Sequence, residues 1–86
     1  MIVIEVRFFG GQHLFTRRLS PEIARALPMV TLPDGATVED LLRLLNISTG
    51  EGRPLVSVNR FLQRENAPLA DGDRVQLMVT VAGGAH

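Results

Sequence analysis

One apolar stripe at helical spacing, with strand-like segments on both sides of it, limits most strongly how this chain can fold. The stripe comprises Val38, Leu41, Leu42 and Leu45, which recur at i, i+3, i+4 and i+7 and therefore share one helix face. Thr37 precedes it as a typical N-cap residue. A single helix of this kind can cover one face of a sheet, so the pattern predicts an α+β domain.

Apolar and polar residues alternate in several other segments. We expect strands over residues 2–9, 29–32, 55–59 and 74–81, and a small edge strand within residues 60–66. The inward positions of the first strand are Ile2, Ile4, Val6 and Phe8, and those of the last are Val75, Leu77, Val79 and Val81. A hydroxyl, a proline and an acid at residues 20–22 predict a short second helix that ends before Pro28. Residues 1–82 are thus expected to form one domain, followed by a flexible tail over residues 83–86.

Composition excludes several classes of function. The 86 residues carry nine Lys plus Arg against nine Asp plus Glu, so the formal net charge is zero and gives no general attraction to nucleic acid. Cysteine is absent, which excludes disulfides, thiolate catalysis and thiolate metal sites. No segment approaches the roughly 18–20 apolar residues of a membrane span, and the first residues show no signal-peptide pattern. We therefore expect a cytoplasmic protein that does not bind membranes.

Catalytic and metal-binding constellations are also missing from the sequence. Its two histidines, His13 and His86, have no partners at metal-ligand spacing, so no bound metal is expected. Ser20, Ser48 and Ser57 occur in no nucleophile motif and fit cap, loop or strand positions instead.

Four segments, in order, carry a resemblance to a known family. They are residues 33–42 (PDGATVEDLL), 58–59 (VN), 68–75 (PLADGDRV) and 81–84 (VAGG). The chain resembles the ubiquitin-like β-grasp sulfur carriers, which include the small subunit of molybdopterin synthase and the sulfur carrier of thiamine synthesis. Its length and its Val-Ala-Gly-Gly segment are more similar to the molybdopterin subunit. The resemblance implies a β-grasp roll, with a mixed sheet of four to five strands covered by one main helix.

The resemblance also implies a function in which the end of the chain is the reactive group. A ubiquitin-activating-type enzyme uses ATP to adenylate the C-terminal glycine, here Gly84, and sulfur delivery then leaves a thiocarboxylate. A synthase large subunit uses that sulfur in molybdopterin-type cofactor biosynthesis. Gly83 and Gly84 lack Cβ atoms, which suits a flexible tether that enters a narrow site. The protein is then a cosubstrate and not an enzyme, and the chain itself binds no cofactor.

Two features depart from the family pattern. Ala85 and His86 follow Gly84, so the carboxyl group that should be activated is held in a peptide bond. A peptidase removes both residues, or the carrier function is lost, or the two residues derive from cloning. The segment 10–28 is also longer than the simple first turn of the family, and a short helix inserted there changes the outline beside the first hairpin.

The outward face of the sheet offers a second kind of function. Alternation places Val3, Phe9, Leu55 and Met78 outside the main core. We expect a partner-binding surface made by Leu55, Phe61, Met78, Val81 and Ala82, although scattered apolar residues on a sheet are also ordinary. One alternative is therefore a β-grasp binding or adaptor module without activation of its end. Another is a sulfur carrier for thiamine, cysteine or tungsten-cofactor synthesis.

Overall fold

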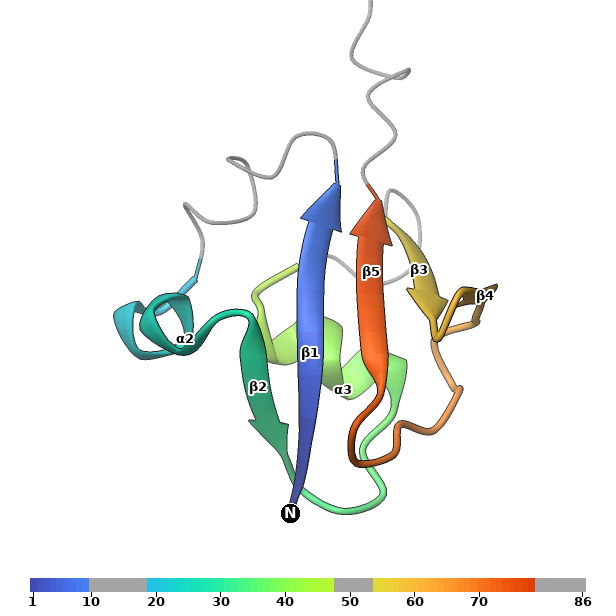
Figure 1. The fold of residues 1–86 in the computed structure, drawn as a ribbon, viewed down its shortest axis with the longest axis horizontal. Helices are drawn as coiled ribbons and strands as arrows, with labels where there is room; N and C mark the ends of the chain where they lie inside the picture. Colours follow the sequence, from blue (N-terminus) through green and yellow to red (C-terminus); the bar gives the residue numbers. More distant parts are fainter. Residues whose placement is uncertain (10–18, 48–53, 79–86) are drawn as a thin grey trace, which may run out of the picture.

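The computed structural model describes residues 1–9, 19–47 and 54–78 of the chain (Figure 1). Its elements are β1 (Ile2–Phe9), α2 (Pro21–Ala26), β2 (Met29–Leu32), α3 (Val38–Leu44), β3 (Leu55–Val58), β4 (Phe61–Leu62) and β5 (Arg74–Met78). The strands predicted over 2–9 and 29–32 are confirmed. β3 ends one residue earlier than predicted, because Asn59 begins a turn. Residues 79–81 of the last predicted strand lie outside the described residues.

The strands form one mixed sheet in the order β2-β1-β5-β3-β4. β1 and β5 pair in parallel at the centre of the sheet, and the other neighbouring strands pair antiparallel. Figure 1 shows α3 crossing behind the sheet, where it covers one face. No helix of the described residues lies on the other face, which we call the bare face. The predicted mixed sheet with one main helix is therefore confirmed.

The core lies between α3 and the covered face of the sheet. The predicted apolar stripe is confirmed, because Val38, Leu41, Leu42 and Leu45 are all fully buried. The sheet contributes inward residues from its three central strands, namely Ile4, Val6, Val56, Val75 and Leu77. Because this face is closed by packing, a partner can reach the sheet only on the bare face or along its edges.

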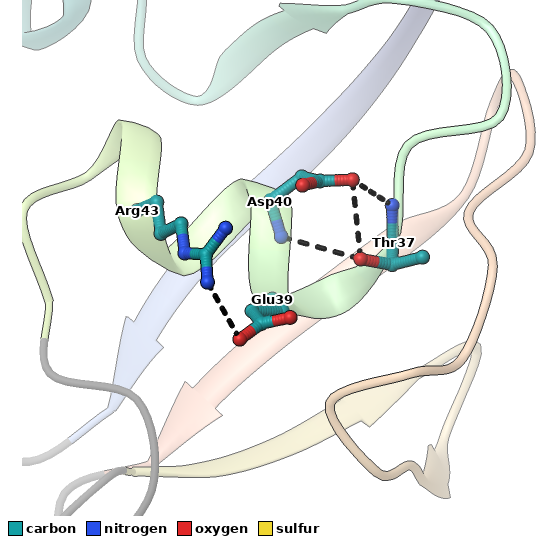
Figure 2. Close-up of polar contacts among 4 residues, drawn as sticks. All are labelled: Thr37, Glu39, Asp40 and Arg43. Atoms are coloured by element: carbon teal, nitrogen blue, oxygen red, sulfur yellow. Dashed lines mark hydrogen bonds and ion pairs between the residues drawn. The ribbon is translucent and has the colours of Figure 1, made fainter.

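A capping box begins α3 (Figure 2). The Thr37 hydroxyl accepts a hydrogen bond from the Asp40 backbone N–H at 3.3 Å, and the Asp40 carboxylate accepts one from the Thr37 N–H at 2.9 Å. These bonds satisfy backbone donors that the first turn of a helix leaves unpaired. The bond from the Thr37 N–H, together with one that the Thr37 hydroxyl donates to the same carboxylate at 3.1 Å, holds the pKa of Asp40 below its usual value, because both stabilise the carboxylate form. The predicted N-cap at Thr37 is confirmed.

The second helix, α2, lies beside β2 in the long connection that follows β1 (Figure 1). It begins as predicted, with the Ser20 hydroxyl accepting from the Ile23 N–H at 3.4 Å and Pro21 in the first turn. Ile23 and Leu27 pack against the core from this side. No helix in the described ranges is long and apolar enough to cross a membrane.

Candidate functional site

An apolar row crosses three strands on the bare face of the sheet. Phe9 of β1 lies beside Met78 of β5, and Met78 lies opposite Leu55 of β3. Paired residues on adjacent strands point to the same face. Phe9 and Leu55 are 47% and 48% exposed, and Met78 is partly buried between them. We call Phe9, Met78 and Leu55 the outer row. It is a continuous apolar surface at the end of the sheet where β5 ends.

The two apolar side chains of the edge strand β4 lie on opposite faces of the sheet. Phe61 pairs with Val58, which is buried on the helix side of the sheet, whereas Leu62 pairs with Ser57 on the bare face. Both side chains of β4 are exposed. The bare face therefore carries Leu62 and not the expected Phe61 near Leu55, and sequence reasoning missed Leu62.

Val3 does not join the outer row. It lies six residues before Phe9 on β1, which in an extended strand is about 20 Å away. Its backbone N–H donates to the Asp71 carboxylate at 2.7 Å, so it belongs to the end of the sheet that the 69–73 turn holds. Val81, Ala82, Gly83 and Gly84, the remaining predicted site residues, lie outside the described residues.

A polar hollow of about 450 Å³ adjoins the outer row on the bare face. It is lined by residues of β1 and β5 and of the turn after β3, namely Glu5, Arg7, Asn59, Arg60, Arg74, Val75 and Gln76. Among these described residues, three are arginines and one carries a carboxylate. The Arg7 guanidinium donates to Glu5, and this bond holds the pKa of Glu5 below its usual value. Glu5 is therefore ionised at neutral pH, and its charge offsets one of the three guanidinium groups.

Asn59 fixes the wall of this hollow. Its side-chain amide donates to Asp73 at 3.0 Å, and its side-chain oxygen accepts from the Arg74 backbone N–H at 3.0 Å. Asp73 in turn accepts from the Ala70 N–H at 2.8 Å. The turn after β3 is thereby attached to the start of β5, so Arg60 and Arg74 are held on one rigid frame.

Other groups considered from the sequence have structural roles. Ser20 caps α2, and Ser57 is buried in β3. His13 and Ser48 lie outside the described residues. Across residues 1–9, 19–47 and 54–78, no three acidic or histidine side chains gather in a way that could hold a metal ion.

Comparison with known proteins shows which family and which solved structures the chain resembles. Residues 21–84 match the family model described as the ThiS family. A putative molybdopterin converting factor, subunit 1, from Pyrococcus furiosus superposes with a TM-score of 0.68 at 21% identity, over 94% of this chain and all of that one. The H. volcanii small archaeal modifier protein 1 gives the same TM-score and coverage at 18% identity. No curated protein matches significantly. The expected β-grasp fold is confirmed.

Proposed function

Because the chain belongs to the ThiS family, we propose that it is a sulfur carrier whose Gly84 carboxyl group is adenylated and then converted to a thiocarboxylate. Proteins of this kind are not catalysts themselves. The chain then acts as a protein cosubstrate that donates sulfur, in molybdopterin-type cofactor biosynthesis. Because activation consumes ATP, which the activating partner binds, we place the protein in the cytoplasm.

The observation that carries this proposal is the extent of the family match. It runs through residue 84 and stops before Ala85, so Gly83 and Gly84 fall within the family pattern and the last two residues do not. Removal of Ala85 and His86 by a peptidase gives Gly84 a carboxylate of its own. The two residues therefore act as a block on activation.

The chemistry explains why this end has to be activated. A carboxylate is a poor electrophile, since its negative charge is delocalised over two oxygens. When the Gly84 carboxylate attacks the α-phosphate of ATP, pyrophosphate leaves and an acyl adenylate forms. A hydrosulfide ion that the partner supplies then attacks the acyl carbon, the bond from that carbon to the phosphate oxygen breaks, and AMP leaves. The resulting thiocarboxylate sulfur is the atom that the synthase large subunit takes up.

The outer row gives the partners a place to bind near that end. Gly84 follows Met78 by six residues, so it can lie no farther than about 22 Å from the row. Phenylalanine, methionine and leucine offer the apolar centre that protein interfaces use. We propose that the adenylating enzyme, the large subunit and the processing peptidase bind over this row.

The decisive experiment compares three lengths of the chain in an adenylation assay. The full sequence, a form ending at Gly84 and a form ending at Gly83 are each incubated with ATP and the host's adenylating enzyme. We expect ATP–pyrophosphate exchange with the Gly84 form only, and intact mass spectrometry should show oxygen replaced by sulfur once a sulfur donor is added. No exchange with the Gly84 form would refute the proposal.

A second candidate is an adaptor that binds through the outer row and never activates its end. Two observations favour it: the row is exposed, and Ala85 follows Gly84. Partner binding that survives deletion of residues 83–86, together with a full-length mass in the host, would support the adaptor.

The pathway that receives the sulfur is a separate question. The similarity to a modifier protein fits a chain whose activated glycine is passed to another acceptor, and thiamine, cysteine or tungsten-cofactor synthesis can also use such a carrier. Supplying the thiocarboxylate form to each synthase, and measuring the product, distinguishes these routes.

A further inference from the structure

The described residues that line the arginine hollow carry more positive than negative charge. Arg7, Arg60 and Arg74 line it, and Glu5 is the one carboxylate among its lining residues in the described part of the chain. The Glu5 carboxylate accepts a hydrogen bond from the Arg7 guanidinium. The hollow is therefore complementary to a negatively charged group, although the chain as a whole has no net charge.

Arg60 occupies a backbone position that an arginine rarely takes. Two residues, Asn59 and Arg60, connect the paired residues Val58 and Phe61, and both have positive φ, at 52° and 76°. A two-residue turn of this kind favours asparagine or aspartate first and glycine second. Asn59 follows this preference, whereas Arg60 costs free energy relative to glycine. Strained residues often occur where a residue has a function, and Arg60 is one of the residues that line the hollow.

We propose that this hollow binds acidic side chains of a protein partner, while an adjacent apolar residue of that partner packs on the outer row. Guanidinium groups bind carboxylates through two parallel hydrogen bonds, which gives both strength and orientation. The described lining residues of the hollow come from β1, β5 and the turn after β3.

The neighbourhood of the hollow favours a protein carboxylate over a phosphate. Arg7 and Gln76 pair with each other two residues before the pair Phe9 and Met78, which places charge and apolar surface about 7 Å apart on one face. Arginine, aromatic residues and methionine are the side chains enriched in protein interfaces. The negative charge of Glu5 also weakens the attraction of the hollow for a multiply charged phosphate. A single carboxylate of a partner can instead bind the arginines at a distance from Glu5.

The test uses two capped peptides and inorganic phosphate as probes of the intact ¹⁵N-labelled protein. One peptide alternates glutamate with leucine, and its matched control carries glutamine in place of glutamate. We expect the glutamate peptide to shift the backbone amides of Arg7, Asn59 and Gln76, and the glutamine peptide to leave them in place. Substituting Arg60→Gln or Arg74→Gln should each weaken binding by about tenfold, since each removes charged hydrogen bonds.

Arg43→Gln is the matched control, because Arg43 pairs with Glu39 on α3, behind the sheet. Its affinity for the glutamate peptide should stay within about twofold of the unsubstituted chain. Arg60→Gln keeps the strained turn with a neutral side chain, so it isolates the charge even if Arg74→Gln does not fold. Equal shifts with the glutamine peptide, tighter binding of phosphate than of the glutamate peptide, or unchanged affinity in Arg60→Gln would each overturn the proposal. None of these results depends on activation of Gly84.

Discussion

Thr37 and Asp40 cap the same helix reciprocally. The Thr37 hydroxyl accepts a hydrogen bond from the Asp40 backbone N–H, and the Asp40 carboxylate accepts one from the Thr37 backbone N–H. This reciprocal pair fixes where α3 begins, and so where the apolar stripe meets the sheet. Replacing Thr37 by alanine removes one acceptor and should lower the free energy of unfolding by about 1 kcal/mol. Thr37→Ser keeps the oxygen and should unfold close to the unsubstituted chain in urea. Equal losses in both variants would contradict the assigned cap.

The Asp40 carboxylate of this cap makes the stability of the folded protein depend on pH. The pKa of Asp40 is lower in the folded protein than in the unfolded chain, chiefly because of the hydrogen bond from the Thr37 backbone. Its stabilising contribution is therefore complete above the ordinary aspartate pKa of about 3.9, and is lost as the pH falls through the lower folded value. Asp40→Asn should be less stable than the unsubstituted chain at pH 7, and the difference should close as the pH falls below the ordinary aspartate pKa. Urea titrations across this range measure it, and a gap that widened on acidification would contradict the prediction.

Because Arg60 has a positive φ, its substitution by glycine should raise the free energy of unfolding. Arg60→Gly removes the cost of positive φ, partly offset by the greater freedom of glycine in the unfolded chain, so we expect a gain of up to about 1 kcal/mol. Arg60→Ala keeps the unfavourable φ and should give no such gain. The two variants lose the same guanidinium group, so comparing their unfolding midpoints separates strain from charge.

The core and the bare face should respond differently to the same truncation. Leu41 is fully buried under the sheet, and Leu41→Ala should cost about 2–5 kcal/mol through lost burial and the cavity it leaves. Leu62 is 66% exposed on β4, and Leu62→Ala should change stability by no more than about 0.5 kcal/mol. Thermal unfolding of both variants tests the assignment of the two faces.

A charge placed in the outer row should weaken binding of the partner while the chain stays folded. Leu55→Asp places a charge at the end of the row on a side chain that is 48% exposed, so we expect little loss of stability but much weaker binding to the adenylating enzyme. Val3→Asp is the matched control, because Val3 is also exposed on the bare face but lies at the other end of β1. Co-purification of the enzyme with each variant measures the difference, and equal loss in both would show that the row is not the contact.

Local chemistry explains which elements could be read from the sequence. The cap at Thr37 and the stripe that follows it depend on residues within two turns of helix, so the start and the buried face of α3 were predictable. The alternation of β1 and β5 depends on the same short-range pattern. The mixed β-grasp sheet was expected from the family resemblance, and the order of its strands was not predicted, since that order depends on pairing between distant segments.

The faces of β4 illustrate what alternation alone cannot decide. Whether Phe61 or Leu62 reaches the bare face depends on how many residues the preceding turn contains, and a change of one residue exchanges the two faces. The strand was expected to include Asn59, which left the length of the turn undefined. Positive φ at both Asn59 and Arg60 shortens the turn to these two residues, and the asparagine was the available signal. The arginine hollow was not predictable, because it unites β1, β5 and this turn.

The parallel pairing of β1 with β5 has a consequence for synthesis on the ribosome. β5 lies between β1 and β3, so the strand at the middle of the sheet is the last of the described strands to be translated. Until it emerges, the β1–β2 pair and the β3–β4 pair have no strand to join them, and their apolar faces stay open to solvent. β5 joins them by pairing with both β1 and β3, and the bond between Val3 and Asp71 at the start of this pairing spans 68 residues of sequence. The nascent chain therefore completes its fold only after Met78 has left the ribosome, and until then chaperones can reach those apolar faces.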